Sequence, residues 1–261
     1  MKCKSGKNRG KRNACFFLGI LSLVTVVLCL SASCNADGRK AQKYEYGVFL
    51  NADRTAVPKL KNYETVVIDA QYFSKKDIRK LHADGTKVYS YLNIGSVENF
   101  RPYYKTYEHL AIGDYENWEE EKWVNVADKD WQEFMDTLAG KLKKKGVDGF
   151  FIDNCDVYDY AYKKDIFDGL TVILKKIRAM GKPVVVNGGD IYVTAYQSRY
   201  GSAADIMTGV NQESVWSRID FTTKTFHTQK KRSGSISASI CRHAKRMEWM
   251  FICWNTRQTI N

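Results

Sequence analysis

The sequence has few of the residues that build metal centres. Its 261 residues include only four histidines, and no two of them have the spacing of a metal-binding pair. Because transition-metal sites usually recruit histidine, a zinc-type centre is disfavoured, and we expect no metal and no cofactor. A Mg²⁺ or Ca²⁺ site made only of oxygen ligands is still compatible with the sequence. A metal-dependent barrel hydrolase, such as a phosphodiesterase, is therefore kept as an alternative function.

A disulfide framework is lacking as well. Six of the seven cysteines lie near the ends of the chain, namely Cys3, Cys15, Cys29, Cys34, Cys241 and Cys253. Cys155 is alone in the central part and follows a group of polar residues, where it could act as a nucleophile. No histidine lies nearby in sequence to activate it. We therefore predict that Cys155 is a packing residue.

Acidic residues are almost absent from the two ends of the chain. Residues 1–34 carry six Lys or Arg and no acid, and residues 222–261 carry eight bases and one acid. These ends account for the whole net charge of +12, and the part between them is close to neutral. The basic balance is thus poor support for nucleic-acid binding, and we expect no nucleic-acid partner.

The amino-terminal charge fits an export signal. A basic stretch precedes an apolar run over residues 15–30, and Ser31-Ala32-Ser33-Cys34 follows it. The run is shorter than the ~20 residues of a membrane span, and the pattern is typical of a signal peptide over residues 1–34. Small residues before Cys34 are also similar to a bacterial lipoprotein cleavage site, although Ser31 stands where Leu is usual. We predict a monomeric bacterial protein that is secreted or lipid-anchored at the cell surface, with no other membrane contact.

Six apolar runs in the central part each end in polar residues. They are Val48–Leu50 with Asn51 and Asp53, Val66–Ile68 with Asp69, Val88–Ile94 with Glu98, Phe150–Ile152 with Asp153, Asn154 and Asp156, Val184–Val186 with Asn187, and Ile206–Val210 with Asn211 and Glu213. Such runs predict strands covered on both faces, and chemistry gathers at the carboxyl ends of such strands. Asp and Asn also cap helices and shape turns, but their recurrence at one end of all six runs favours a site.

Helical patterns alternate with these runs. Apolar residues repeat at helical spacing over residues 131–142 and 166–177, and Ser74 with Asp77 resembles a capping box. Gly85, Gly146 and Gly181 end helices just before strands. The alternation predicts a parallel sheet, in either a (β/α) barrel or an open doubly wound sheet.

The barrel is favoured because a dinucleotide-binding sheet should show a glycine fingerprint in its first turn. The first turn here is Asn51-Ala52-Asp53-Arg54. Asn187-Gly188-Gly189 resembles that glycine fingerprint only weakly, because its spacing is wrong.

The long segment from Ser96 to Ala127 is rich in aromatic residues and acids. Aromatic faces with interspersed carboxylates suit sugar rings, and they also suit cations. Plain hydrophobic packing is the alternative, and it is favoured for Trp118 and Trp123.

Four motifs together resemble the endo-α-1,4-polygalactosaminidases of glycoside hydrolase family 114. They are Tyr91-Leu92-Asn93-Ile94-Gly95-Ser96 with Glu98 and Arg101, Gly149-Phe150-Phe151-Ile152-Asp153-Asn154-Cys155-Asp156, Val186-Asn187-Gly188-Gly189, and Gly209-Val210-Asn211-Gln212-Glu213. The resemblance covers about residues 44–221. It implies a (β/α)₈ TIM-type barrel that hydrolyses α-1,4-linked galactosamine-rich polysaccharide.

The family resemblance also implies roles for the polar residues. Glycoside hydrolysis generally needs two carboxyl groups, and by similarity Asp153 is the nucleophile and Glu213 the acid/base of a retaining mechanism. The residues assigned to substrate binding are Asp53, Asp69, Tyr91, Asn93, Glu98, Arg101, Asn154, Asp156 and Asn187. Of these, Asp53, Asp69, Glu98 and Asp156 could recognise the ammonium group of galactosamine, while Tyr91, Asn154 and Asn187 bind hydroxyls.

The carboxyl-terminal part departs from the family pattern. The barrel domain is predicted over residues 35–221, where six strands are recognisable, and residues 222–261 form an atypical tail that looks truncated or frameshifted. In the tail, only Trp249–Trp254 could imitate a strand. We predict an incomplete barrel of poor solubility. A barrel that binds carbohydrate without turnover is the alternative function.

Overall fold

The computed structural model describes residues 43–116, 118–213, 217–220, 223, 225–228 and 250–253. The signal predicted for residues 1–34 and the boundary that follows it lie outside the described residues, as does most of the tail. None of the helices in these ranges has the length and apolar character that crossing a membrane requires.

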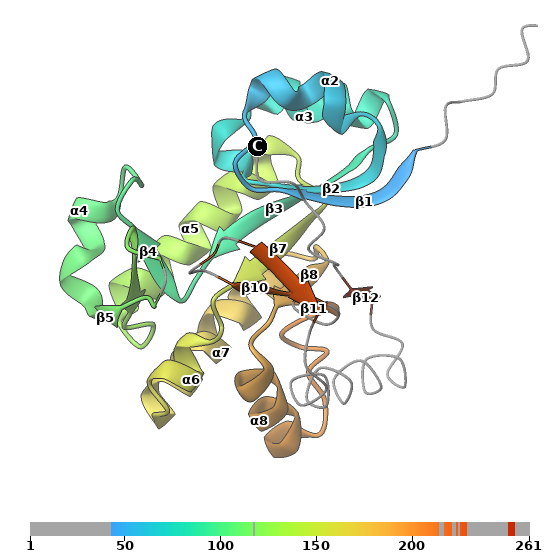
Figure 1. Ribbon diagram of the computed structural model, residues 1–261. Helices are drawn as coiled ribbons and strands as arrows, with labels where there is room; N and C mark the ends of the chain where they lie inside the picture. Colours follow the sequence, from blue (N-terminus) through green and yellow to red (C-terminus); the bar gives the residue numbers. More distant parts are fainter. Residues whose placement is uncertain are drawn as a thin grey trace, which may run out of the picture. The chain divides into compact units, whose positions relative to one another are not determined.

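A seven-stranded parallel sheet forms the centre of the fold (Figure 1). Its strands, in their order across the sheet, are β1 (Tyr44–Phe49), β2 (Tyr63–Ile68), β3 (Lys87–Asn93), β7 (Gly149–Asp153), β8 (Val184–Asn187), β9 (Gly209–Gln212) and β12 (Met250–Cys253). The first six confirm the six predicted runs, although β9 begins at Gly209 rather than Ile206. The seventh comes from the tail and pairs with β9, Met250 opposite Gly209.

The helices come from the segments between the strands. They are α2 (Val57–Leu60), α3 (Lys75–Ala83), α4 (Tyr104–Tyr107), α5 (Lys129–Lys145), α6 (Val157–Tyr160), α7 (Lys164–Ala179) and α8 (Asp190–Tyr200), with short 3₁₀ turns η1 (Arg54–Ala56), η2 (Ala70–Tyr72) and η3 (Glu108–Leu110). The predicted capping box of α3 is present, with Ser74 and Asp77 bonded reciprocally. Gly85, Gly146 and Gly181 all have positive φ, which confirms them as the residues that end α3, α5 and α7.

Two apolar layers lie on opposite faces of the sheet. Phe150 and Ile152 belong to the large core that includes the buried faces of α5 and α7. Phe151 belongs to a smaller cluster with Val67, Tyr91 and other inward-facing residues. Because successive strand residues point to opposite faces, both faces are filled. The result is a curled parallel sheet with covering helices, which confirms the predicted incomplete barrel.

The long segment after β3 adds a small antiparallel sheet. Its strands are β4 (Ser96–Glu98), β6 (Glu121–Val124) and β5 (Ala111–Asp114), in that order. A separate hairpin, β10 (Ser217–Asp220) with β11 (Thr225–Thr228), follows the last predicted strand of the barrel. The predicted loop is thus a folded excursion that brings its own polar residues to the end of β3.

Candidate active site

Polar residues share one level at the carboxyl ends of adjacent strands. Asn93 of β3 lies opposite Asp153 of β7, and Asn187 of β8 lies opposite Asn211 of β9. Ile152 pairs with Val186, so Asp153 and Asn187 follow directly at the same level. Parallel register therefore gathers these side chains of four strands into one row, whereas Asp53 and Asp69, after the first two strands, cap η1 and η2.

Asn187 connects the two predicted catalytic carboxylates. Its Nδ2 donates to Oδ1 of Asp153 at 2.9 Å and to Oε1 of Glu213 at 3.0 Å. Because one nitrogen makes both bonds, the two acceptor oxygens lie at most about 5.9 Å apart. The structure thus brings together Asp153 and Glu213, which stand 60 residues apart in the sequence.

Asn211 fixes the orientation of the Asn187 amide. Its Nδ2 donates to Oδ1 of Asn187 at 2.6 Å, and Asn211 is fully buried. With its oxygen engaged on that side, Asn187 must turn its NH₂ group toward the two carboxylates. Asn211 was recognised in the sequence as a strand-end residue but was not assigned to the site.

The Asn211–Asn187 contact leads to a prediction. In Asn211→Asp the new carboxylate cannot donate, so the Asn187 amide should rotate and direct its oxygen at Asp153 and Glu213. The Asn187 hydrogen bond lowers the pKa of Asp153, so its loss should raise that pKa. The acidic limb of the pH profile of kcat/KM should then move to higher pH, and kcat should fall about 100-fold. Asn62→Asp, at an exposed position, is the control. An unchanged pH profile would contradict the orienting role.

The environment of Asp153 favours its protonated form. Burial raises the pKa of Asp153 to about 7, the Asn187 hydrogen bond opposes this, and the charge of Glu213 adds to it. The hydroxyl of Tyr91, which projects from β3 on the inner face, also donates to Asp153. A carboxyl group that titrates near neutrality is suited to proton transfer or to a shared proton.

A second polar network lies next to this pair and is centred on Glu121 of β6. Its Oε2 accepts from Ser96 Oγ at 2.6 Å, from Asn154 Nδ2 at 3.3 Å and from Asn93 Nδ2 at 3.5 Å. Tyr115 donates to Oδ1 of Asn154 at 3.2 Å. Burial raises the pKa of Glu121. The predicted ligands Asn93 and Asn154 thus both donate to Ser96 and to Glu121, and sequence reasoning missed Glu121.

Asn154 has an unusual backbone that places this network. Its φ is 65°, the left-handed region that non-glycine residues seldom adopt. Gly95 permits the conformation, since a Cβ at position 95 would lie 1.8 Å from the Asn154 carbonyl oxygen. The absence of a side chain at Gly95 therefore allows the chain to turn sharply directly after Asp153.

Arg101 holds two of the predicted substrate-binding acids. It donates to both oxygens of Glu98, at 3.1 and 2.8 Å, and to Oδ2 of Asp69. All three side chains are buried. Two carboxylates against one guanidinium leave a net charge of −1, so the group stays acidic although its oxygens are partly occupied by protein.

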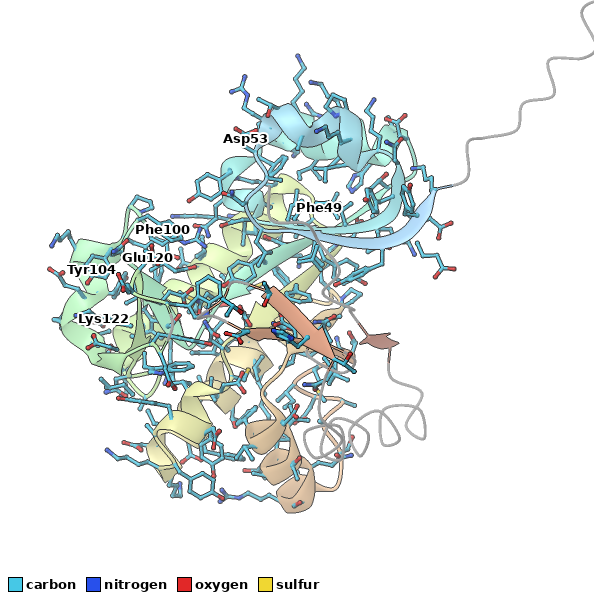
Figure 2. The ribbon with its side chains drawn as sticks, in the orientation of Figure 1. Phe49, Asp53, Phe100, Tyr104, Glu120 and Lys122 are labelled. Carbon is cyan, nitrogen blue, oxygen red and sulfur yellow. The ribbon has the colours of Figure 1, made fainter. Side chains whose placement is uncertain are left out.

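The other two predicted acids also bind the backbone. Asp53 lies in the loop after β1, is exposed, and caps η1 by accepting from the Thr55 amide at 2.8 Å (Figure 2). Asp156 accepts from the amide of Gly189 at 3.2 and 3.1 Å, and burial raises its pKa to about 6. Asp156 thereby fixes the glycine turn that follows Asn187.

Aromatic residues of the excursion form a stack beside the Glu121 network. The ring of Trp123 lies 4.1 Å from Tyr115 and 5.5 Å from Tyr160, nearly parallel to both. Trp123 is buried, as the packing interpretation favoured, but Trp118, for which packing was also favoured, is 48% exposed, and Tyr160 is half exposed. The stack supports Tyr115 and, through it, Asn154.

The region after Asp153 also contains Cys155 and several acids, which bear on thiol chemistry and on metal binding. Cys155 is fully buried, and burial raises the pKa of its thiol, which agrees with the predicted packing role. No group of three or more His, Cys, Asp or Glu in the ranges given above is arranged to hold a metal ion.

A comparison with protein families identifies the chain. Residues 30–195 match the model of glycoside-hydrolase family GH114, which covers more than half of the sequence. The chain belongs to this family. Family GH114 is thus confirmed as the resemblance that the four motifs indicated, and the chain is a glycosidase by membership. Glu213 lies beyond the matched residues, so its position rests on the structure. Among curated proteins, none matches this sequence.

Solved structures agree on the fold of this GH114 chain. The glycoside hydrolase domain of PelA from Pseudomonas aeruginosa has 14% identity and a TM-score of 0.65, covering 81% of this chain and 82% of that one. Ega3 from Aspergillus fumigatus, in complex with galactosamine, has 19% identity and a TM-score of 0.50, covering 69% and 82%. A family GH13_31 enzyme has 11% identity and a TM-score of 0.53, covering 82% and 59%. These likenesses support the barrel-type fold.

Proposed function

We propose that this protein hydrolyses glycosidic bonds in a galactosamine-containing polysaccharide, using Asp153 and Glu213. Family membership supplies the reaction class, and the solved complex of Ega3 with galactosamine suggests the sugar. The observation that carries the assignment is the single Asn187 amide bonded to both carboxylates. The other described pair of acids held by one side chain, Asp69 with Glu98, is bonded to the charged guanidinium of Arg101 and not to a neutral amide.

The spacing of the pair supports a retaining mechanism. Carboxyl groups about 5 to 5.5 Å apart are typical of retaining glycosidases, whereas about 6.5 to 9.5 Å leaves room for the water of an inverting one. The facing oxygens of Asp153 and Glu213 lie at most about 5.9 Å apart, which is compatible with the retaining arrangement. We therefore propose that one carboxylate attacks the anomeric carbon while the other protonates the leaving oxygen.

The roles of the two acids follow from family similarity, with Asp153 as nucleophile and Glu213 as acid/base. The raised pKa of Asp153 opposes this order in the empty site, because it favours a proton on the residue that must attack. A sugar ammonium close to Asp153 would favour its ionised form. The proposed order thus requires that bound substrate ionises Asp153.

Azide rescue distinguishes the two orders. With an aryl α-galactosaminide oligomer that carries a good leaving group, Asp153→Ala should regain activity with azide and yield the β-glycosyl azide. Glu213→Ala should yield the α-azide, because its nucleophile is intact. Exchanged products would make Glu213 the nucleophile and contradict the proposed order. Glu133→Gln, on the exposed face of α5, is the control and should react without azide.

The acidic surroundings support recognition of an amino sugar. Together with burial, the charges of Asp153, Glu121 and Glu213 all raise the pKa of Tyr115, and the Arg101 cluster keeps one net negative charge. We propose that this combined charge attracts the ammonium group, with Asp69 and Glu98 contributing through the cluster. Neutralising Asp69 and Asp156 together should therefore weaken the preference for deacetylated over acetylated polymer.

We also propose export, because a polysaccharide of this kind lies outside the cell. The support is the basic, apolar and small-residue pattern of residues 1–34. Secreted and lipid-anchored forms are distinguished by the mass of the mature amino-terminal peptide, since a lipid on Cys34 adds to it.

A further inference from the structure

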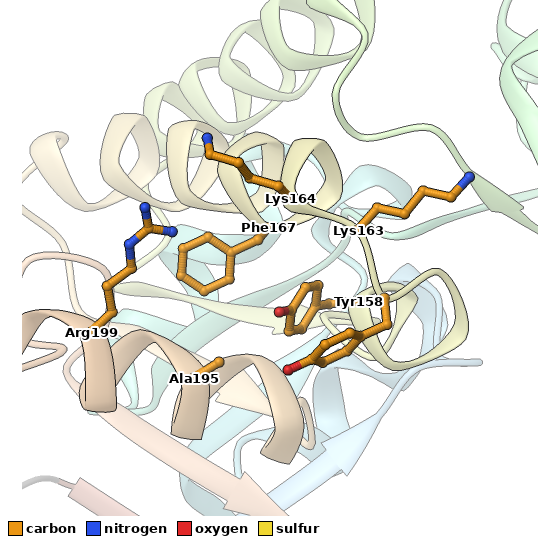
Figure 3. A pocket seen from close by; sticks show the side chains of 7 residues that line it. Tyr158, Lys163, Lys164, Phe167, Ala195 and Arg199 are labelled. Carbon is orange, nitrogen blue, oxygen red and sulfur yellow. The ribbon is translucent and has the colours of Figure 1, made fainter.

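A concave pocket lies between α6, α7 and α8 (Figure 3). It has a volume of about 230 Å³ and is lined by Tyr158, Tyr162, Lys163, Lys164, Phe167, Ala195 and Arg199. None of these residues takes part in the carboxylate pair or in the networks around it. The pocket is therefore a separate feature of the surface.

Aromatic rings form the inner wall of this pocket. Phe167 is buried and its ring lies 5.4 Å from that of Tyr158, edge to face. Tyr162 packs against Tyr158 at 4.6 Å and is largely exposed. The exposed ring of Tyr162 thus offers a flat surface to the C–H face of a sugar, and the buried rings of Tyr158 and Phe167 support it from behind.

Cations surround the rings. The Arg199 guanidinium lies over Phe167 at 5.5 Å, and in Figure 3 the two lysines stand on other sides of that ring. Lys164 pairs with Asp168, but neither Lys163 nor Arg199 has an acidic partner among the described residues. The ionisable groups that line the pocket are thus three bases and two tyrosines, with no acid.

The two lysines lie at the amino end of α7, where positive charge is unfavourable unless an anion balances it. Lys163 is the N-cap residue of the 16-residue helix α7 and its side chain makes no capping bond, and the first turn holds one acid, Asp165, beside the two lysines. Positive side chains at a helix amino end oppose the helix dipole, which favours anions there. An anion in the pocket would relieve this repulsion, which supports what the lining residues indicate.

We propose that this pocket binds a sugar unit that carries a carboxylate, such as a uronic acid residue. The guanidinium fork of Arg199 matches a carboxylate, and the aromatic wall matches the pyranose ring. The volume is below the ~300 Å³ of sites for larger ligands, which suits one sugar ring. The same cations would repel galactosamine, so the ligand differs in charge from the proposed substrate. This inference does not depend on catalysis by Asp153 and Glu213.

The test is an NMR titration of the ¹⁵N-labelled protein with three sugars of one shape. Methyl α-galacturonide carries the carboxylate, methyl α-galactoside replaces it with a neutral group, and methyl α-galactosaminide carries an amine. The galacturonide should shift amides of residues 158–167 and 195–199 and bind at least tenfold more tightly than the other two. Arg199→Gln should weaken it about tenfold, Arg199→Lys less, and the exposed control Lys59→Gln not at all.

Three results would overturn the proposal. Equal binding of galacturonide and galactoside would remove the role of the carboxylate. Unchanged affinity in Arg199→Gln would place the ligand elsewhere. Acetate that binds as tightly as the galacturonide would show that the rings contribute nothing, leaving a general anion site instead of a sugar site.

Discussion

Asp153→Asn should make the protein more stable at neutral pH while removing its activity. Burial raises the pKa of Asp153 from 3.8 to about 7, so the folded state holds the proton more tightly than the unfolded state. For such an acid, stability falls as pH rises from the unfolded pKa through the folded one. The cost of the ionised carboxylate is absent below about pH 4 and fully present above about pH 7, where it amounts to about 4 kcal/mol.

The measurement is the free energy of unfolding of wild type and Asp153→Asn between pH 4 and pH 8. The two proteins should be nearly equal at pH 4, and the variant should gain up to about 4 kcal/mol by pH 8. Turnover should fall by at least about 10³-fold. A difference in stability that does not change with pH would mean that the Asp153 carboxyl group does not titrate as inferred.

Gly95→Ala should strongly reduce both stability and activity. The added Cβ would lie 1.8 Å from the Asn154 carbonyl oxygen, a backbone atom that cannot move without shifting Asp153. We expect a loss of about 3 kcal/mol in the free energy of unfolding and at least a 100-fold fall in kcat, because displacement by about 1 Å is costly in catalysis.

Gly140→Ala is the matched control for this substitution. Gly140 lies in α5 with nothing within 4 Å of an added Cβ. Alanine favours helix, so this variant should gain about 0.5 to 1 kcal/mol and keep full activity. If Gly95→Ala behaved like Gly140→Ala, the tight approach of Gly95 to Asn154 would not position the site.

Local sequence patterns predicted much of the fold because the strands are short apolar runs with polar ends. Phe150 to Asp156 is the clearest example, since a buried strand stops at residues that must face solvent or a ligand. The capping box at Ser74 and the glycines at 85, 146 and 181 act over three or four residues. Such signals need no knowledge of distant contacts.

Other features depend on contacts between distant segments. Glu121 follows Glu119 and Glu120, so it resembles part of a solvated acidic surface, yet strand β6 carries it to Asn93 and Asn154. Arg101 lies 32 positions after Asp69 in the sequence and forms an ion pair with it, so its positive charge compensates much of the negative charge expected at Asp69. The pairing of Met250–Cys253 with β9 was likewise hidden, because no helical pattern precedes that run.

The most direct test of the account is reducing-end release from deacetylated α-1,4-galactosamine polymer. Residues 35–261 would be compared with Asp153→Asn, Glu213→Gln and the exposed control Glu133→Gln. The account predicts release by wild type and the control, and a loss of at least about 10³-fold in each carboxylate variant. Full activity in either carboxylate variant, or a folded wild type that binds the polymer without cleaving it, would contradict a catalytic pair at Asp153 and Glu213.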